Sequence, residues 1–184
     1  MFRFVAIIST FIIILISCSK TSDIENSYNS LIGSEICIPF NDFELVSYGA
    51  KCDSTFKNWT YVSYVGFNEC TPCNMSNVNQ WNRIQEIFDK HSLNLKIVLI
   101  FSPSKYIKDG IIKNYRQSNC TREIYIDTIG SFMKKNVQVP ENSIFHTMLL
   151  DSLNRVVLIG NPTRNYKVRE LLCSYVDSIS KCEK

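Results

Sequence analysis

Glycine, proline and net charge are all scarce in this chain of 184 residues. Six Gly and five Pro, with aromatic residues at 12%, exclude collagen-like and disordered compositions. The 20 Lys and Arg nearly balance the 17 Asp and Glu, and a net charge of +3 is too small to indicate a surface that binds nucleic acid. Hydrophobic residues make up 45% of the chain, so its length fits one well-buried domain and excludes two large ones.

The apolar run at the N-terminus is too short for a transmembrane helix. It covers thirteen residues, 4–16, after a cationic start at Arg3. As a helix it would reach roughly 20 Å into a hydrocarbon core that is ~30 Å thick. Such a pattern is typical of a signal peptide. The motif Leu15-Ile16-Ser17-Cys18 resembles the bacterial lipobox, in which the cysteine is lipidated and becomes the first residue of the mature protein.

We therefore predict a lipoprotein signal peptide at 1–17, a lipidated Cys18 and a flexible polar tether over 18–34. An uncleaved N-terminal anchor and a chance apolar stretch are the alternatives. Ser19 resembles the sorting signal of outer-membrane lipoproteins, so we expect a lipid anchor in the bacterial cell envelope, in the outer membrane and facing the periplasm or the cell surface. The eight cysteines, a high count for a reduced cytosolic protein, agree with export.

Residues 35–184 alternate between strand-like and helix-like patterns. β-branched and aromatic runs that end at turns predict strands at 43–48, 60–66, 93–101, 123–127, 145–150 and 155–159. Apolar residues at three- and four-residue spacing predict helices at 70–90, 105–116, 129–136 and 168–179. This order predicts one α/β domain over 35–184, with a central mixed β-sheet, helices on both faces and an N-terminal β extension.

Two cysteines stand where the strand at 60–66 passes into the next helix. In Cys70-Thr71-Pro72-Cys73 the spacing puts both sulfurs on one side of the first helical turn, where they can form a disulfide. Free N–H groups and the helix dipole favour the Cys70 thiolate as the attacking sulfur, and Cys73, deeper in the turn and less exposed, would resolve a mixed disulfide. Pro72 removes no intrahelical hydrogen bond there. A static disulfide or half of a metal site is the alternative, although the sequence holds no second Cys-x-x-Cys.

This chain resembles the thioredoxin-like, membrane-tethered thiol–disulfide oxidoreductases of the TlpA type, especially their lipoprotein forms in Bacteroidetes. The resemblance begins near Glu35 and is carried by residues 64–73, 145–151 and 156–162. It implies a thioredoxin-like fold and exchange of the Cys70–Cys73 disulfide with exported, cysteine-containing client proteins, without a metal or cofactor. A DsbD-like membrane electron donor would recharge the pair. The alternative is a redox-inert thioredoxin-fold binding module of the cell envelope, which binds its partner through the face around Phe145.

Three positions depart from the thioredoxin pattern, and His146 follows one of them. Glu69 replaces the tryptophan before the first cysteine, and its charge would oppose the neighbouring thiolate unless it is simply solvated. Phe145 takes the place of the cis-proline that faces the disulfide, so we expect a trans peptide before it. His146 could donate or accept protons beside the sulfurs, or point to solvent. Tyr64 replaces the buried carboxylate six residues before the first cysteine.

Five cysteines lie outside the motif and the lipobox, so at least one is unpaired or bonded to another chain. They are Cys37, Cys52, Cys120, Cys173 and Cys182. Cys37 with Cys52, both ahead of the core, is the pairing to test first, and buried inert thiols are the alternative. Cys173 and Cys182 would lie about 13.5 Å apart on a continuous helix, beyond the ~7 Å that a disulfide spans, so they pair only if that helix ends early.

Cys18→Ser tests the lipobox prediction. Without the thiol the chain has no acceptor for the lipid, so the variant should remain unprocessed or be recovered in a soluble form. Membrane fractionation and mass analysis of the expressed protein measure both outcomes. A variant that still fractionates as a processed membrane protein would show that Cys18 is not the lipidation site.

Overall fold

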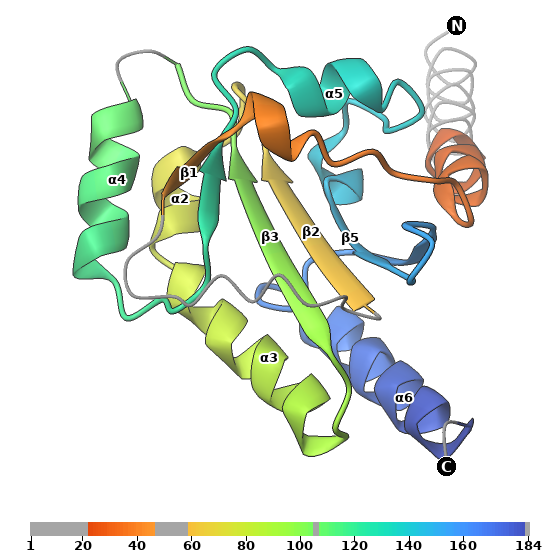
Figure 1. Cartoon of the computed structure of the whole chain (residues 1–184). Helices are drawn as coiled ribbons and strands as arrows, with labels where there is room; N and C mark the ends of the chain where they lie inside the picture. Colours follow the sequence, from red (N-terminus) through yellow and green to blue (C-terminus); the bar gives the residue numbers. More distant parts are fainter. Residues whose placement is uncertain (1–21, 47–58, 105–106, 183–184) are drawn as a thin grey trace, which may run out of the picture.

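The computed structural model of the chain describes residues 22–46, 59–104 and 107–182 (Figure 1). The predicted signal peptide, the lipidation site Cys18 and Cys52 lie outside these ranges. Within them, no helix combines the length and the apolar character needed to cross a membrane. The three described segments hold a six-stranded sheet and the Cys-x-x-Cys motif.

The strands form one mixed sheet in the order β1-β4-β3-β2-β5-β6. Parallel pairing joins β2 to β3 and β3 to β4, and antiparallel pairing adds β1, β5 and β6. The central strands β2 and β3 are almost continuously buried, because both faces of the sheet are covered. The predicted central mixed sheet is confirmed. Its strands are Glu44–Val46 (β1), Trp59–Val65 (β2), Leu95–Phe101 (β3), Ile124–Ile126 (β4), Thr147–Leu150 (β5) and Val156–Ile159 (β6).

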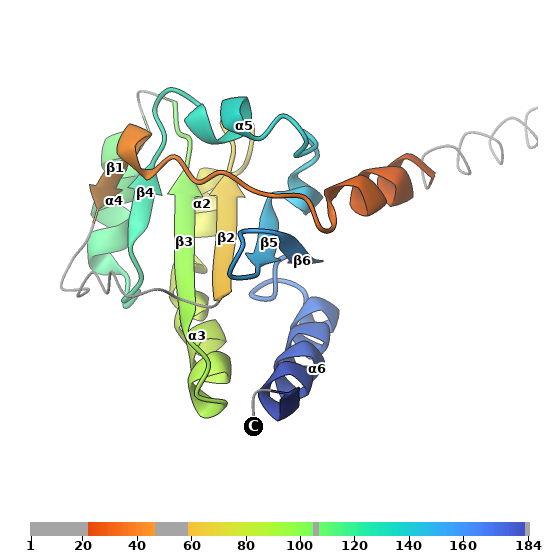
Figure 2. The same cartoon turned by 45° about the vertical axis from the view of Figure 1, so that its right-hand side comes forward.

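Each face of the sheet carries its own hydrophobic core. Helices α2, α3, α4 and α6 pack on one face, around Tyr61, Trp81 and Phe88. Helix α5 and the N-terminal chain pack on the other, around Leu31 and Phe132 (Figure 1, Figure 2). The predicted helices on both faces are confirmed. The α-helices are Thr71–Met75 (α2), Trp81–Lys90 (α3), Lys108–Gln117 (α4), Ser131–Lys135 (α5) and Tyr166–Cys182 (α6), and the 3-10 helices are Phe40–Asp42 (η1), Val78–Gln80 (η2) and Ser143–Phe145 (η3).

The single helix predicted at 70–90 is wrong, because the chain breaks after the five residues of α2. The carbonyl of Cys73 would accept an intrahelical N–H four residues later. Instead it accepts from the side chains of Ser76, at 3.0 Å, and Asn77, at 3.3 Å. Such side chains compete with the backbone for hydrogen bonds and so interrupt helices. The dipole that acts on Cys70 is therefore that of a short helix.

The flexible tether predicted over 18–34 differs from the structure, in which residues 22–31 form a helix. Leu31, at its end, is fully buried. The Gly33 N–H donates to the Val156 carbonyl at 2.8 Å, and the Val156 N–H donates to the Ser34 carbonyl at 3.0 Å. The apolar residues 24, 28 and 31 recur at helical spacing within an otherwise polar stretch. The domain therefore includes residues 22–34.

Residues 35–46 cross one face of the whole sheet (Figure 2). Glu35 pairs with Arg155 beside β6, and β1 pairs with β4 at the opposite edge. Midway, the buried Asn136 accepts the Cys37 N–H and donates to the Cys37 carbonyl, both at 2.8 Å. This side chain satisfies backbone groups that the crossing would otherwise leave unpaired. The predicted N-terminal β extension is confirmed as β1.

Gly160, directly after β6, provides a test of how α6 packs. It has a φ of +128°, and a Cβ there would lie 2.9 Å from Val168 Cγ2 on α6. We expect Gly160→Ala to lower the free energy of unfolding by roughly 2 kcal/mol or more, because backbone strain adds to the clash. Urea unfolding of the disulfide-bonded protein, followed by tryptophan fluorescence, measures the change.

Gly110→Ala is the matched control. Gly110 lies inside α4, and a Cβ there would meet nothing within 4 Å. This substitution should raise the free energy of unfolding by about 0.5–1 kcal/mol, because alanine loses less backbone entropy in a helix. Equal stabilities of the two variants would rule out the close packing of α6 on Gly160.

Candidate functional site

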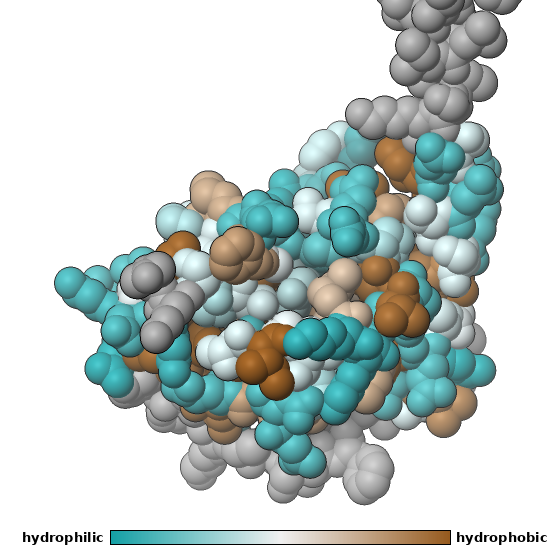
Figure 3. Space-filling view, turned by 90° about the horizontal axis from the view of Figure 1, so that it is seen from above, coloured by the Kyte–Doolittle hydropathy of each residue, from teal (hydrophilic) through white to brown (hydrophobic). Residues whose placement is uncertain are grey.

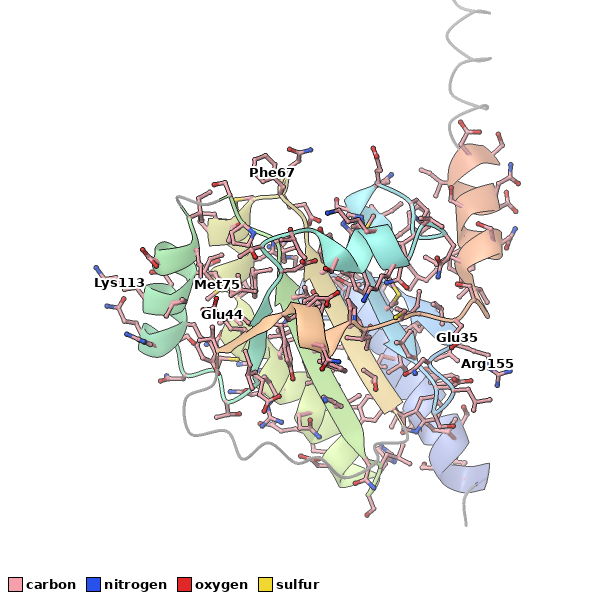
Figure 4. The ribbon with its side chains drawn as sticks, turned by 45° about the horizontal axis from the view of Figure 1, so that its top comes forward. Glu35, Glu44, Phe67, Met75, Lys113 and Arg155 are labelled. Carbon is pink, nitrogen blue, oxygen red and sulfur yellow. A yellow bond between two sulfur atoms is a disulfide. The ribbon has the colours of Figure 1, made fainter. Side chains whose placement is uncertain are left out.

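The Cys70–Cys73 pair forms a disulfide at the start of α2, with the two Cα atoms 5.3 Å apart. Loop 66–69 leads into it from the end of β2. Both cysteines are exposed. Figure 3 views the end of the molecule where β2 and β3 finish, and there apolar residues are scattered among hydrophilic ones. Phe67, 67% exposed, projects outward from the loop (Figure 4). The disulfide is accessible to another protein.

The two sulfurs differ in their hydrogen bonds. Cys70 is the N-cap of α2, and its Sγ accepts the Cys73 N–H at 3.3 Å. A hydrogen bond of this kind favours a thiolate at the N-cap. Both residues are exposed, and the lower exposure expected for Cys73 stays a prediction. Between them Thr71 is buried and Pro72 exposed in the first turn, where proline is tolerated.

Glu69 is held inside the loop before the disulfide. Its Oε1 accepts the Gly66 N–H at 2.9 Å and lies 2.6 Å from His146 Nδ1. Its side chain is 21% exposed. The interpretation of Glu69 as a simply solvated carboxylate is therefore wrong, and this residue joins the loop to the chain that enters β5.

His146 is buried directly before β5 and does not point to solvent. Only 5% of the residue is exposed, and its Nε2 lies 3.0 Å from the Pro140 carbonyl oxygen. Its own carbonyl accepts the Tyr64 N–H at 2.8 Å, which extends the β2–β5 ladder. The edge of its ring faces Tyr64, with 5.4 Å between the ring centroids. The structure thus brings His146 and Glu69 together from 77 residues apart.

Phe145 does not occupy the place that the sequence predicts for it. It ends η3 and is buried in the core that also contains Leu31 and Met148. The residue that meets the loop before the disulfide is instead His146, one position later. The expected trans peptide before Phe145 is confirmed, as the described residues contain no cis peptide bond. The strand predicted at 145–150 begins only at Thr147, because η3 occupies Ser143–Phe145.

The polar group on the α2 side of β2 is Ser63, and the sequence analysis missed it. Alternation along β2 places Tyr64 on the α5 side, stacked on Phe132. Burial raises the pKa of Tyr64, so this phenol stays neutral near pH 7 and cannot act as a base. Ser63 faces the other way and shares a buried 3.2 Å hydrogen bond with Thr147. The period-two pattern of the strand is the signal that could have identified it.

Outside the motif, Cys37, Cys120 and Cys173 are free thiols. Burial raises the pKa of the Cys120 thiol, which makes it a poor nucleophile. The expected partner of Cys37 lies outside the described residues. Cys173 and Cys182 could form a disulfide only if their helix ended early, but α6 continues to Cys182. In the described ranges, no three His, Cys, Asp or Glu side chains gather as a metal site would require.

An open groove of about 420 Å³ lies beside the disulfide, between α2 and α4. It begins at Pro72, and no charged side chain lines it. Three of its polar groups are the amides of Asn79, Asn114 and Gln117. Such amides both donate and accept hydrogen bonds, so the groove suits an uncharged polar chain.

The comparisons with known proteins rest on solved structures, because no protein-family model and no curated protein matches the chain. The "putative Thiol:disulfide interchange protein DsbE" of Chlorobium tepidum aligns at 14% identity with a TM-score of 0.53, over 79% of this chain and 97% of that one. An uncharacterized thioredoxin-like protein of Porphyromonas gingivalis aligns at 14% identity with a TM-score of 0.51, over 80% and 94%. The chain has a thioredoxin-like fold.

A third thioredoxin-like structure, from Bacteroides caccae, is the longer protein. It aligns over 86% of this chain at 14% identity with a TM-score of 0.48. This chain spans about half of that protein, 55% of its length. At such identities the comparisons concern the backbone, and the side chains of the site are described by this structure alone.

The hydrogen bond to Cys70 Sγ predicts unequal reactivity once the disulfide is reduced. We expect Cys70 to be alkylated about fivefold faster than Cys73 near neutral pH, since one hydrogen bond contributes about 1 kcal/mol. A pulse of iodoacetamide followed by peptide mass mapping measures both rates. Cys37, exposed and free, is the internal reference, and equal rates at Cys70 and Cys73 would contradict the asymmetry.

Proposed function

We propose that this protein is a membrane-tethered thiol–disulfide oxidoreductase of the TlpA type, which exchanges its Cys70–Cys73 disulfide with exported proteins. The observation that carries the proposal is an exposed disulfide in the first turn of the helix after β2, in a thioredoxin-like sheet. A similar backbone in a protein named for thiol:disulfide interchange supports it. The hydrogen bond from the Cys73 N–H to Cys70 Sγ supports Cys70 as the attacking sulfur.

In the reducing direction, the Cys70 thiolate attacks one sulfur of a client disulfide. A new S–S bond joins Cys70 to the client, and the client's other sulfur leaves with the electron pair and takes up a proton. Cys73 then loses its proton and attacks the Cys70 sulfur, which closes the Cys70–Cys73 bond and releases the second client thiol. The client gains two electrons from the protein and two protons, one released by Cys73 and one taken from solvent.

The groove beside Pro72 offers a place for the client chain. A client cysteine bonded to Cys70 would have its neighbouring residues near α2, where the groove begins. Amide side chains can pair with the N–H and C=O groups of an extended polypeptide whatever its sequence. A groove without charged residues therefore suits clients that each contain a disulfide but differ in sequence around it.

The proposed location is the bacterial cell envelope, with the protein held by lipid on Cys18 in the outer membrane and facing the periplasm or the cell surface. The support is the lipobox-like motif at 15–18 and Ser19 after it. In that setting a DsbD-like membrane electron donor would return the disulfide to its dithiol. Reduction of exported proteins requires such a donor, because each turnover leaves Cys70 and Cys73 oxidised.

Cys73→Ser tests the mechanism. The Cys70 thiolate remains but nothing resolves the intermediate, so exported proteins should accumulate as mixed disulfides on Cys70. Non-reducing electrophoresis of the purified variant, followed by mass analysis, identifies them. Cys70→Ser should trap none and should abolish disulfide exchange.

Cys37→Ser is the matched control for stray thiols, because Cys37 is exposed and free. Added to the trapping variant, it should leave the captured proteins unchanged. Trapping by Cys70→Ser instead of Cys73→Ser would invert the two roles. If neither variant traps a protein and the wild type reduces no disulfide, the redox-inert binding module replaces this proposal.

A further inference from the structure

Glu69 and His146 share one proton beside Cys70. The Pro140 carbonyl can only accept a hydrogen bond, so His146 Nε2, 3.0 Å from it, carries a hydrogen. His146 Nδ1 lies 2.6 Å from Glu69 Oε1, a contact that requires a proton between the two atoms. On either atom, that proton leaves the pair as a whole without net charge.

The net charge of the Glu69–His146 pair can affect the Cys70 thiolate, because Glu69 lies in the loop directly before Cys70. Glu69 directly precedes Cys70, and the Gly66 N–H holds its Oε1 inside the loop at 2.9 Å. The side chains of His146 and Glu69 are 6% and 21% exposed, so water and salt screen them only in part. A carboxylate here without its partner would disfavour a thiolate on the next residue.

The neighbouring titratable groups do not replace His146 as that partner. Tyr64 on β2 faces the His146 ring, and burial raises the pKa of this phenol, so it stays neutral. Asp127, after β4, is a carboxylate that accepts the N–H groups of Ser131 and Phe132 at the start of α5. Among the described residues, the ion pair of Glu69 is with His146.

We propose that His146 is a positioning residue that neutralises Glu69 and thereby sets the reduction potential of the Cys70–Cys73 couple. The inference rests on the proposed function, because the potential matters only for a pair that exchanges electrons. Reduction adds two electrons to the S–S bond and leaves one sulfur as a thiolate. An uncompensated carboxylate would destabilise that reduced state alone and lower the potential. His146 therefore keeps the couple less reducing than Glu69 alone would make it.

Three variants of the full chain distinguish an effect of the Glu69 charge from a structural effect of the contact. Each is equilibrated with reduced and oxidised glutathione, and its reduction potential is measured. His146→Gln should shift the equilibrium about tenfold toward the disulfide, which makes the couple about 30 mV more reducing. Glu69→Gln leaves the pair without net charge, as in wild type, and should stay within about threefold of wild type. The double variant should also return to within about threefold of wild type, because removing the carboxylate removes the repulsion.

A merely structural contact predicts the opposite, since the double variant would then be perturbed at least as much as His146→Gln. Glu141→Gln is the matched control, because it removes an exposed carboxylate next to Pro140 and should leave the potential unchanged. If His146→Gln does not fold, His146→Asn takes its place with the same expected shift toward the disulfide. A wild-type potential in that variant would overturn the proposal.

The same measurement separates this inference from the proposed function. If the wild type does not exchange with glutathione at all, the proposed function fails. If it exchanges but His146→Gln keeps the wild-type potential, only the role of His146 fails. A double variant that is not rescued also overturns that role.

Discussion

The register of β2 against β5 is the constraint on which the rest of the site depends. Ser63 lies opposite Thr147, and the hydrogen bond from the Tyr64 N–H to the His146 carbonyl continues this ladder one step past the strand. A slip of one residue would turn every side chain of β5 to the other face, and His146 would no longer meet Glu69. The burial of β2 on both faces makes such a slip costly.

The N-terminal chain covers one face of the sheet, and α2, α3, α4 and α6 cover the other. It encloses the core around Leu31 and runs from the β6 side to the opposite edge (Figure 2). A chain that crosses a sheet without pairing along it leaves its own polar groups unsatisfied. Asn136 supplies the missing partners to Cys37, so a buried polar residue allows an apolar face to be covered by irregular chain.

Two features of the site act on the Cys70 sulfur. The break after α2 leaves Cys70 a short helix with a smaller dipole, yet the Cys73 N–H still reaches its sulfur. Glu69 places a carboxyl group in the loop directly before Cys70, where its Oε1 lies 2.6 Å from His146 Nδ1. The reactivity of the pair therefore depends on a few contacts that substitutions can remove one by one.

The sequence by itself determined the order of strands and helices, the mixed sheet and the position of Cys70-Thr71-Pro72-Cys73 at a strand-to-helix junction. These features follow from periodicity and turn chemistry, which act between residues close along the chain. Only the tertiary structure decided that His146 and not Phe145 meets Glu69 and that residues 22–34 belong to the domain. The physical reason is that these outcomes depend on strand register and on which face a strand turns to a distant segment. The sequence of one strand does not show where its partner strand begins, so it determines neither the register nor the distant segment that the strand meets.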